Sequence, residues 1–158
     1  SKVGVNTHSA NKIVHHALKN NLIEEFNEIL EIKPETKFGS NTRFDFLVFK
    51  KRDKAFIEVK NVTLSRKKDI AEFPDAITAR GLKHINELIK ASKQSYKVFI
   101  LYLIQRDDCK SFTIAKDIDP AYAATLAKAV KKKLNILCYD CKFSLKGIKL
   151  NNKINYKT

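Results

Sequence analysis

The sequence predicts one α/β domain in which helices flank a mixed central sheet. Helical and strand-like patterns alternate along the chain, residues 43–60 have the pattern of a β-hairpin, and residues 97–104 form a nearly continuous apolar run. Such a run is typical of a central strand that is buried on both faces, and the alternation indicates layers of helix and sheet. A length of 158 residues suits one full core and leaves little room for two. We therefore expect residues 1–158 to form a single domain.

The first part of the chain is expected to form two helices and a short strand. Ser9 or Asn11 can cap a helix whose apolar residues share one face; they are Ile13, Val14, Ala17 and Leu18. A second short helix is expected over residues 22–30, with Pro34 as its end. Residues 35–38 then predict a short edge strand before a turn at residues 39–41.

The middle of the chain is expected to form the hairpin and a long helix. Residues 43–49 and 55–60 alternate as paired strands around a turn, with Phe44, Phe46 and Val48 on one side of the first strand. Asp75 is the expected N-cap of the long helix. Gly81 within that helix suggests that another element approaches its backbone closely.

The last part of the chain supplies a further helix and strands. Pro120 begins a helix through Tyr122, Leu126 and Val130, and strands are expected at residues 136–139 and in an alternating segment at 143–150. The predicted order is α, α, β, β, β, α, β, α, β, β. The sheet should be antiparallel through the hairpin and parallel where helices cross over.

The chain is strongly basic. It has 31 Lys and Arg against 17 Asp and Glu, a formal charge of +14. This excess favours a polyanionic partner, nucleic acid first and an anionic membrane surface second, although a Lys-rich composition bias explains it as well. No segment has the apolar length of a membrane span, and none combines the charge with a large apolar face. We expect a cytoplasmic protein with no membrane partner.

The cysteines predict neither a disulfide framework nor a zinc site. There are three, and Cys138 and Cys141 form a C-x-x-C in a strand-like segment. A separation of three places the two thiols on opposite faces of a strand, and zinc needs four ligands. The sequence therefore predicts buried structural thiols.

The hairpin brings two acids and a lysine together. If its turn is centred between Lys51 and Arg52, Asp45 lies directly across from Glu58, and Lys60 shares the face of Glu58. Like charges directly opposed destabilise a sheet unless a cation lies between them. The alternative is a surface strand with a Glu58–Lys60 ion pair and an unrelated Asp45.

Two carboxylates at this spacing suit Mg²⁺ or Mn²⁺. Such ions prefer oxygen ligands and are commonly held by one or two carboxylates together with a substrate phosphate. We expect Asp45 and Glu58 to bind the metal, which would acidify a water molecule. Lys60 would orient that water or stabilise the charge that develops at the phosphate.

These residues resemble a known family. Asp45 followed by Glu58-Val59-Lys60 resembles the signature of the PD-(D/E)xK nucleases, and four longer blocks resemble the sugar fermentation stimulation protein family, SfsA. The blocks are Val5-Asn6-Thr7 with Ala10-Asn11, and residues 43–46, 57–64 and 73–84. The resemblance implies a restriction-endonuclease-like core and a bacterial or archaeal protein that binds DNA without marked sequence preference. It also implies a regulator of sugar (maltose) utilisation whose nuclease activity is less settled than its fold.

The resemblance also raises two questions about missing parts. Family members usually carry a small OB-like β-barrel before this domain, and none precedes Ser1 here, so we expect a truncated or processed chain with reduced DNA affinity. Nucleases of this superfamily often add a Glu from the first helix to the metal site. Glu24, Glu25 and Glu28 are candidates, and a solvated helix face explains them equally well.

Several further residues are candidates for DNA contact. Arg80, Lys83 and His84 share one helix face near its N-terminal half, where phosphate is favoured; the alternative is a solvated basic face. Asn6, Asn11 and Lys12 could contact the same phosphate, although the two asparagines could instead be helix caps. Arg43 is a further candidate, because it lies in the block around Asp45. Gln105 and Arg106 end the central strand and could bind a ligand or be a polar strand end. Lys128, Lys131, Lys132 and Lys133 are typical of a solvated helix end.

Two functions remain in view from the sequence. The first is non-specific DNA binding by a module with nuclease architecture and little or no turnover. The second is a Mg²⁺-dependent DNA phosphodiesterase that uses Asp45, Glu58 and Lys60. We rank binding above cleavage, and the sequence leaves open whether the protein forms homo-oligomers.

Overall fold

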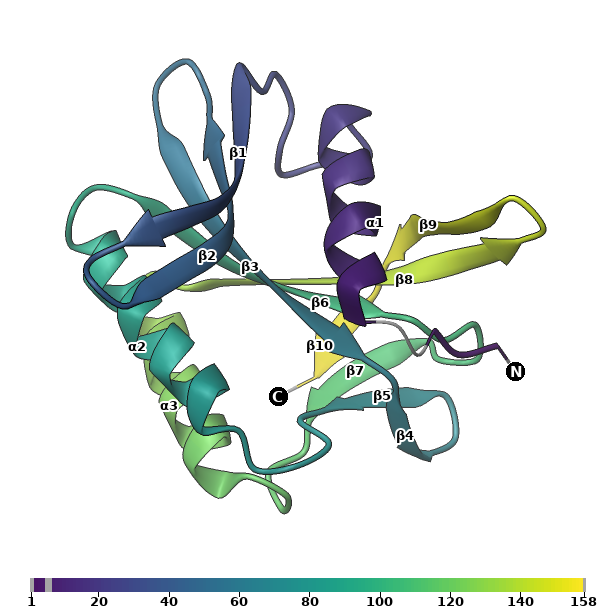
Figure 1. Cartoon of the computed structure of the whole chain (residues 1–158). Helices are drawn as coiled ribbons and strands as arrows, with labels where there is room; N and C mark the ends of the chain where they lie inside the picture. Colours follow the sequence, from purple (N-terminus) through teal and green to yellow (C-terminus); the bar gives the residue numbers. More distant parts are fainter. Residues whose placement is uncertain (1, 5–6, 158) are drawn as a thin grey trace.

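The computed structural model describes residues 2–4 and 7–157. Figure 1 shows the arrangement of the helices and strands. Their order is α1 (Thr7–Lys19), β1 (Glu31–Phe38), β2 (Thr42–Phe49), β3 (Lys54–Val62), β4 (Leu64–Lys67), β5 (Ile70–Phe73), α2 (Ala79–Ser92), β6 (Lys97–Ile104), β7 (Ser111–Ile114), α3 (Pro120–Lys131), β8 (Asn135–Ser144), β9 (Gly147–Lys153) and β10 (Asn155–Lys157).

The main sheet is mixed, as predicted. Its six strands are ordered β1-β2-β3-β6-β8-β9. Strands β3, β6 and β8 are parallel, whereas β1, β2 and β9 pair antiparallel at the two sides. The apolar run at Lys97–Ile104 is the central strand β6, and every residue from Val98 to Ile104 is buried. The prediction of a mixed sheet with helices is confirmed.

Helices cover both faces of this sheet. Helix α1 packs on one face, where Leu18 and Ile57 belong to the same buried cluster. Helices α2 and α3 pack on the other face, where Ile85 and Tyr102 share a second cluster (Figure 1). Because the central strands are apolar on both sides, the sheet forms the middle layer of the core.

A second sheet of four short strands was not predicted. Its order is β10-β7-β5-β4, and it extends the core through Ala71 and Phe112. The strands have only three or four residues each, too few for a clear alternating pattern. Strands β4 and β5 lie in the connection from β3 to α2, β7 lies in the connection from β6 to α3, and β10 follows β9. The first three are therefore inserted into the two crossover connections of the main sheet.

Helix α1 begins earlier than predicted. It starts at Thr7, so Ser9 and Asn11 lie within the helix and the prediction that either caps it is wrong. Its predicted apolar face is confirmed, because Ile13 and Ala17 are buried with their neighbours on that face.

The predicted second helix over residues 22–30 does not form. The backbone has positive φ at Asn21 (56°) and Glu28 (59°), which a helix does not allow. Ile23 and Phe26 are buried, whereas Leu22 and Leu30 are 43% and 71% exposed, so the apolar residues of this irregular segment do not form one buried face. A periodic apolar pattern over a short segment does not distinguish a helix from an irregular segment.

Strand β1 is longer than predicted, and α2 starts later. Pro34 lies inside β1, which is possible because β1 is an edge strand and needs no donor on its open side. The N-cap of α2 is Thr78, whose hydroxyl accepts a hydrogen bond from the Gly81 N–H; the prediction of Asp75 is wrong. A Cβ at Gly81 would lie 3.1 Å from the Tyr122 ring, which confirms the predicted close approach.

The three cysteines are free and buried. Cys138 faces the cluster on the α2 and α3 side, and Cys141 faces the cluster on the α1 side. Burial raises the pKa of both thiols to about 12. The prediction of buried structural thiols on opposite faces is confirmed. In the described ranges no helix is both long and apolar enough to cross a membrane.

Candidate functional site

The hairpin has the register that the sequence predicts. Strands β2 and β3 pair Phe49 with Lys54 and continue to Phe46 with Ile57. One step further along this register, Asp45 reaches the level of Glu58. The two carboxyl groups contact each other at the point where the paired part of the hairpin ends.

The first strand changes face at Asp45. Phe44 packs in the cluster beside α2, whereas Phe46 and Val48 pack in the cluster beside α1. The prediction that the three share one side is therefore wrong. A regular strand would keep them together, so the backbone departs from regular alternation at Asp45.

Hydrogen bonds from two other elements hold the Asp45 carboxylate. The Val59 N–H of β3 donates to Oδ2 at 2.7 Å, and Asn11 Nδ2 of α1 donates to Oδ1 at 2.9 Å. The Asp45 carboxylate thus serves as the acceptor for a backbone N–H of the neighbouring strand, and it also links α1 to the sheet. Both oxygens of Asp45 have fixed directions as a result.

Glu58 lies at the bottom of the site. Its side chain is 3% exposed, and the Oε2 atom is buried without a hydrogen bond of acceptable geometry. Its closest cationic neighbour is Lys60 Nζ at 3.8 Å, and His84 Nδ1 of α2 is in direct contact with Oε2. Burial of this carboxylate excludes the alternative of an ordinary surface strand with a solvated ion pair.

His84 Nδ1 can serve only one of its two neighbours. It contacts Glu58 and lies 3.4 Å from Lys60 Nζ. If Nδ1 carries the proton of the neutral ring it donates to Glu58, and if it does not it accepts from Lys60. Burial first, and then the charges of Lys60 and Arg80, lower the pKa of His84 to about 4, so the ring is neutral at pH 7.

The two acids do not have enough positive charge around them. Burial first, and then the hydrogen bond and negative charge of Glu58, raise the pKa of Asp45 to about 7, against the hydrogen bonds from Val59 and Asn11. A carboxyl group in this state holds a proton near neutral pH or needs an additional cation. The raised pKa of Asp45 thus reflects two carboxyl groups buried side by side.

The chemistry of the donors fits a hard divalent cation. Asp45 and Glu58 supply carboxylate oxygens, and Glu58 Oε2 is buried with the His84 imidazole as its direct contact. Within the described residues there is no cluster of three or more His, Cys, Asp or Glu side chains that could hold a metal. A cation here would take most of its ligands from water or a phosphate, which suits Mg²⁺ or Mn²⁺ better than zinc.

A basic cleft adjoins the acid pair. It lies between the β1–β2 turn and the start of α2 and has a volume of about 410 Å³. We call it the basic cleft; its lining residues are Lys37, Ser40, Asn41, Thr42, Arg43, Arg80, Lys83 and His84. The imidazole of His84 lines the cleft and touches Glu58, so it connects the two parts of the site.

The structure distributes the predicted DNA-contact residues over these two parts. Arg43, Arg80 and Lys83 are exposed in the basic cleft, whereas His84 is only 7% exposed. Asn11 lies at the acid pair, and Lys12 is exposed beside it on α1. Asn6 is outside the described residues.

The candidate helix glutamates are engaged elsewhere. Glu24 and Glu25 both pair with Lys153 of β9, and the Tyr139 hydroxyl donates to Glu25. Glu28 lies in a surface cavity beside His15 and α1. The acid pair therefore has Asn11, and not one of these glutamates, as its partner from the N-terminal region.

The end of the central strand forms a polar network in which one buried atom, Gln105 Oε1, has no hydrogen-bond partner among the described residues. Gln105 is fully buried and donates to Asn61 Oδ1 at 2.6 Å. Arg106 pairs with Asp108 and donates to the Thr63 carbonyl. Of the two readings that the sequence allows, the contacts match a polar strand end.

Sequence reasoning missed the contact of His84 with Glu58. The signal was present, because His84 shares its helix face with Ile85, Leu88 and Ala91, all of which are buried. A histidine at that spacing faces the sheet and not the solvent. Nothing in the sequence indicated that the Val59 N–H bonds to Asp45.

The comparisons with known proteins agree on one family. A family model described as "Sugar fermentation stimulation protein RE domain" matches residues 8–147. The chain is 51% identical to a sugar fermentation stimulation protein homolog of Pelagibacter ubique and 41% identical to one of Roseobacter denitrificans. Each alignment covers 96% of this chain and 66% or 65% of the relative, so the chain spans just under two thirds of these proteins.

A solved structure is similar over nearly the whole chain. It is that of SfsA from Pyrococcus furiosus in complex with Ca²⁺. The TM-score is 0.89 at 25% sequence identity, and the match covers 98% of this chain and 66% of the archaeal one. The arrangement of helices and strands is therefore shared with that protein.

Proposed function

Because the chain belongs to the sugar fermentation stimulation (SfsA) family, we propose that it binds DNA through the phosphate backbone. We further propose that its core is of the restriction-endonuclease, PD-(D/E)xK type, and that the binding serves the control of sugar utilisation for which the family is named. The observation that carries the proposal is the basic cleft beside the acid pair.

The basic cleft has the charge and geometry that phosphate needs. Arg43, Arg80 and Lys83 come from two different elements and converge on one cavity. Each is exposed, so each can exchange its water for a phosphate oxygen at little cost. Arg80 lies in the first turn of α2, where the helix dipole adds to the attraction.

The same features explain why binding would be independent of sequence. Lys and Arg contacts to phosphate fix the position of a nucleic acid but do not read its bases. The net charge of +14 adds long-range attraction to any polyanion. We expect log K to fall linearly with log salt, because each phosphate neutralised releases a counterion.

The experiment is a salt titration of DNA affinity for the wild type and two matched variants. Arg43→Ala with Arg80→Ala removes two cations from the basic cleft, and Lys128→Ala with Lys132→Ala removes two exposed lysines from α3 and its C-cap. The cleft variant should lose about tenfold or more in affinity and have a shallower salt slope. Equal losses in both variants, or an affinity independent of salt, would overturn the proposal.

A second candidate is phosphodiester cleavage with a divalent cation. It is favoured by the convergence of Asp45, Glu58 and Lys60, and by the Ca²⁺ complex in which the Pyrococcus relative was solved. Asp45 and Glu58 would hold the cation, which supplies Lewis acidity and a more acidic water when bound.

The remaining site residues would prepare this chemistry. Asn11 and Val59 fix the direction of the Asp45 oxygens through their hydrogen bonds. Lys60 is 14% exposed and holds its ammonium group beside Glu58, where it can stabilise negative charge on a phosphate. Such preorganised charge is typical of phosphoryl-transfer sites.

Cleavage is tested with supercoiled and single-stranded DNA in Mg²⁺ or Mn²⁺, with Lys60→Ala as the site variant and Lys128→Ala as the control. Loss of cleavage by roughly 100-fold or more in Lys60→Ala alone would support an enzyme. An absence of cleavage by the wild type, or cleavage that Lys60→Ala leaves unchanged, would leave DNA binding as the function.

A further inference from the structure

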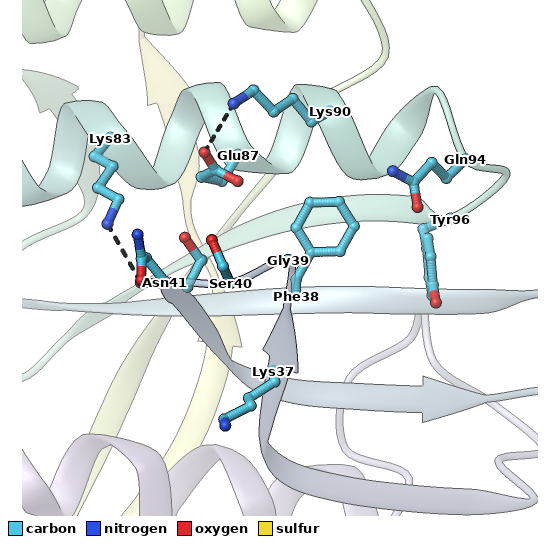
Figure 2. A pocket seen from close by; sticks show the side chains of 11 residues that line it. Lys37, Phe38, Gly39, Ser40, Asn41, Lys83, Glu87, Lys90, Gln94 and Tyr96 are labelled. Carbon is cyan, nitrogen blue, oxygen red and sulfur yellow. Dashed lines mark hydrogen bonds and ion pairs between the residues drawn. The ribbon is translucent and has the colours of Figure 1, made fainter.

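A groove continues from the basic cleft along the whole of α2. It runs between α2 and the β1–β2 turn and has a volume of about 630 Å³. Figure 2 shows the side chains that line it, among them Lys37, Lys83, Glu87, Lys90 and Gln94. The groove shares Lys37 and Lys83 with the basic cleft, so the two cavities form one path.

The groove is narrow. At its junction with the basic cleft, Lys83 Nζ of α2 donates to the Asn41 carbonyl of the β1–β2 turn at 3.3 Å (Figure 2). One lysine side chain therefore spans the distance between the two walls. The major groove of B-DNA alone is about 12 Å wide, so a duplex cannot enter this space. A single extended strand can.

The wall formed by α2 has a regular polar pattern. Lys83, Glu87 and Lys90 follow each other at spacings of three or four residues and so lie along one face, and Gln94 follows just after the helix ends. From Arg80 to Ser92 the helix is about 18 Å long, at 1.5 Å per residue. That length accommodates several phosphates of a single strand.

Positive side chains outnumber negative ones along this wall. Glu87 is the single acid among the residues that line the groove and the cleft, and it pairs with Lys90 at 3.1 Å. The Glu87 side chain is 18% exposed and Lys90 is 66% exposed, so the lysine can turn toward a phosphate. Glu87 then opposes binding while its neighbours favour it.

Aromatic stacking is not available at the far end. Tyr96 lines the groove, but Lys54 Nζ lies 4.3 Å from its ring centroid and the Phe56 ring lies 4.5 Å away. The ring is thus already packed on by other side chains. Binding in the groove would depend on phosphates and polar groups, and it would have little base preference.

We infer that this groove takes a single strand of DNA and leads it to the basic cleft and the acid pair. This inference rests on the proposed function and adds to it the class of nucleic acid. The protein would prefer single-stranded DNA, or a duplex with a single-stranded tail, over a blunt duplex.

The test measures dissociation constants by fluorescence anisotropy with three probes. They are an oligo-dT strand of about 15 nucleotides, a blunt duplex, and the same duplex with an oligo-dT tail. Three charge variants are compared at constant salt: Glu87→Gln and Lys90→Gln in the groove, and Lys128→Gln on α3 as the control.

The groove variants should change affinity in opposite directions. Glu87→Gln should tighten binding of the oligo-dT strand about three- to tenfold, and Lys90→Gln should weaken it by a similar factor, because one charge unit is gained or lost beside the strand. Lys128→Gln should have a much smaller effect. A gain in affinity cannot come from a folding defect, so Glu87→Gln keeps the test decisive.

The outcomes separate the inference from the proposed function. If the wild type binds none of the three probes, the proposed function itself fails. If it binds the blunt duplex as tightly as the oligo-dT strand, or if neither groove variant changes single-strand affinity, the inference is overturned while DNA binding stands.

Discussion

Two clusters of acids, one in each sheet, differ in how a cationic side chain contacts them. In the four-stranded sheet, Arg66 donates to both oxygens of Glu72 and to both oxygens of Asp117. In the six-stranded sheet, Asp45 and Glu58 contact each other and have Lys60 and a neutral His84 beside them. Each cluster contains two acids and one cationic side chain. Arg66 donates directly to all four carboxylate oxygens of the first, whereas Lys60 lies 3.8 Å from Glu58 in the second and Asp45 accepts only from uncharged donors among the described residues.

The pKa values of the acids show the consequence. The hydrogen bond from Arg66 lowers the pKa of Glu72 below its ordinary value and lowers that of Asp117 to about 2. Burial and Glu58 raise the pKa of Asp45 to about 7. A matched cluster stabilises the fold, whereas an unmatched one is characteristic of a site that awaits a ligand. Four predictions test this difference.

The largest expected effect is on binding of a divalent cation. Mn²⁺ titrated into the wild type by calorimetry should bind at Asp45 and Glu58, and Glu58→Gln should weaken the affinity by about 100-fold because it removes a charged ligand. Glu72→Gln changes the same chemical group in the matched cluster and should leave the affinity unchanged. Equal affinities in the wild type and Glu58→Gln would show that the acid pair is not a metal site.

The second effect is on stability without metal. Glu72→Gln removes the charge that matches Arg66 and should lower the free energy of unfolding by about 1–3 kcal/mol. Asp45→Asn should leave it unchanged or raise it by about 1–2 kcal/mol at pH 7, because it removes repulsion between buried acids. Urea denaturation at pH 7 with a chelator measures both. A loss of several kcal/mol in Asp45→Asn would show that its charge is already matched.

The third effect is a difference in pH dependence. The folded pKa of Asp45 is raised, so its contribution to stability is present below about pH 4 and is lost as pH rises toward 7. The folded pKa values of Glu72 and Asp117 are lowered, so their contribution is present above about pH 4 and is lost as pH falls.

Denaturation of the wild type and Asp45→Asn between pH 4 and pH 8 checks this sign. The free energy of unfolding of Asp45→Asn should rise relative to that of the wild type as pH increases to about 7, and the difference should then stay constant. A stability difference that stays constant across this range would mean that Asp45 titrates as an ordinary carboxyl group.

The smallest effect is expected at Asn11. Asn11→Ala removes the donor to Asp45 Oδ1, so it should cost about 0.5–1.5 kcal/mol of stability and weaken Mn²⁺ affinity severalfold by freeing the carboxylate. Asn20→Ala, at an exposed asparagine that bonds the His16 carbonyl on the same helix, is the matched control for metal affinity. If both variants bind Mn²⁺ equally well, Asn11 does not orient Asp45.

The sequence predicts the middle of the main sheet well because its patterns there are long. The apolar run of β6 and the hairpin register depend on several residues each, so one irregular position does not obscure them. The second sheet has strands of three or four residues and escapes detection for the opposite reason. At residues 22–30 the apolar spacing belongs to an irregular segment that buries Phe26 and exposes Leu22 and Leu30, so a short spacing predicts neither the helix nor which residues are buried.

The sequence predicts the acid pair of the candidate site but not the contacts that α1 and α2 make with it. The opposition of Asp45 and Glu58 follows from strand pairing alone, which is local. The contacts of Asn11 and His84 depend on how α1 and α2 pack on opposite faces of the sheet, and no local pattern contains that information. The change of face at Asp45 is likewise a result of tertiary hydrogen bonds.

In the proposed function, the acid pair and the basic cleft act together on DNA. The most direct test is the affinity for oligo-dT with and without Ca²⁺ at constant ionic strength, in the wild type and in Asp45→Asn. We predict that Ca²⁺ tightens binding about tenfold in the wild type, because it neutralises the acids and bridges them to a phosphate, and has little effect in the variant. An equal response of the two proteins to Ca²⁺, or no response in the wild type, would contradict it.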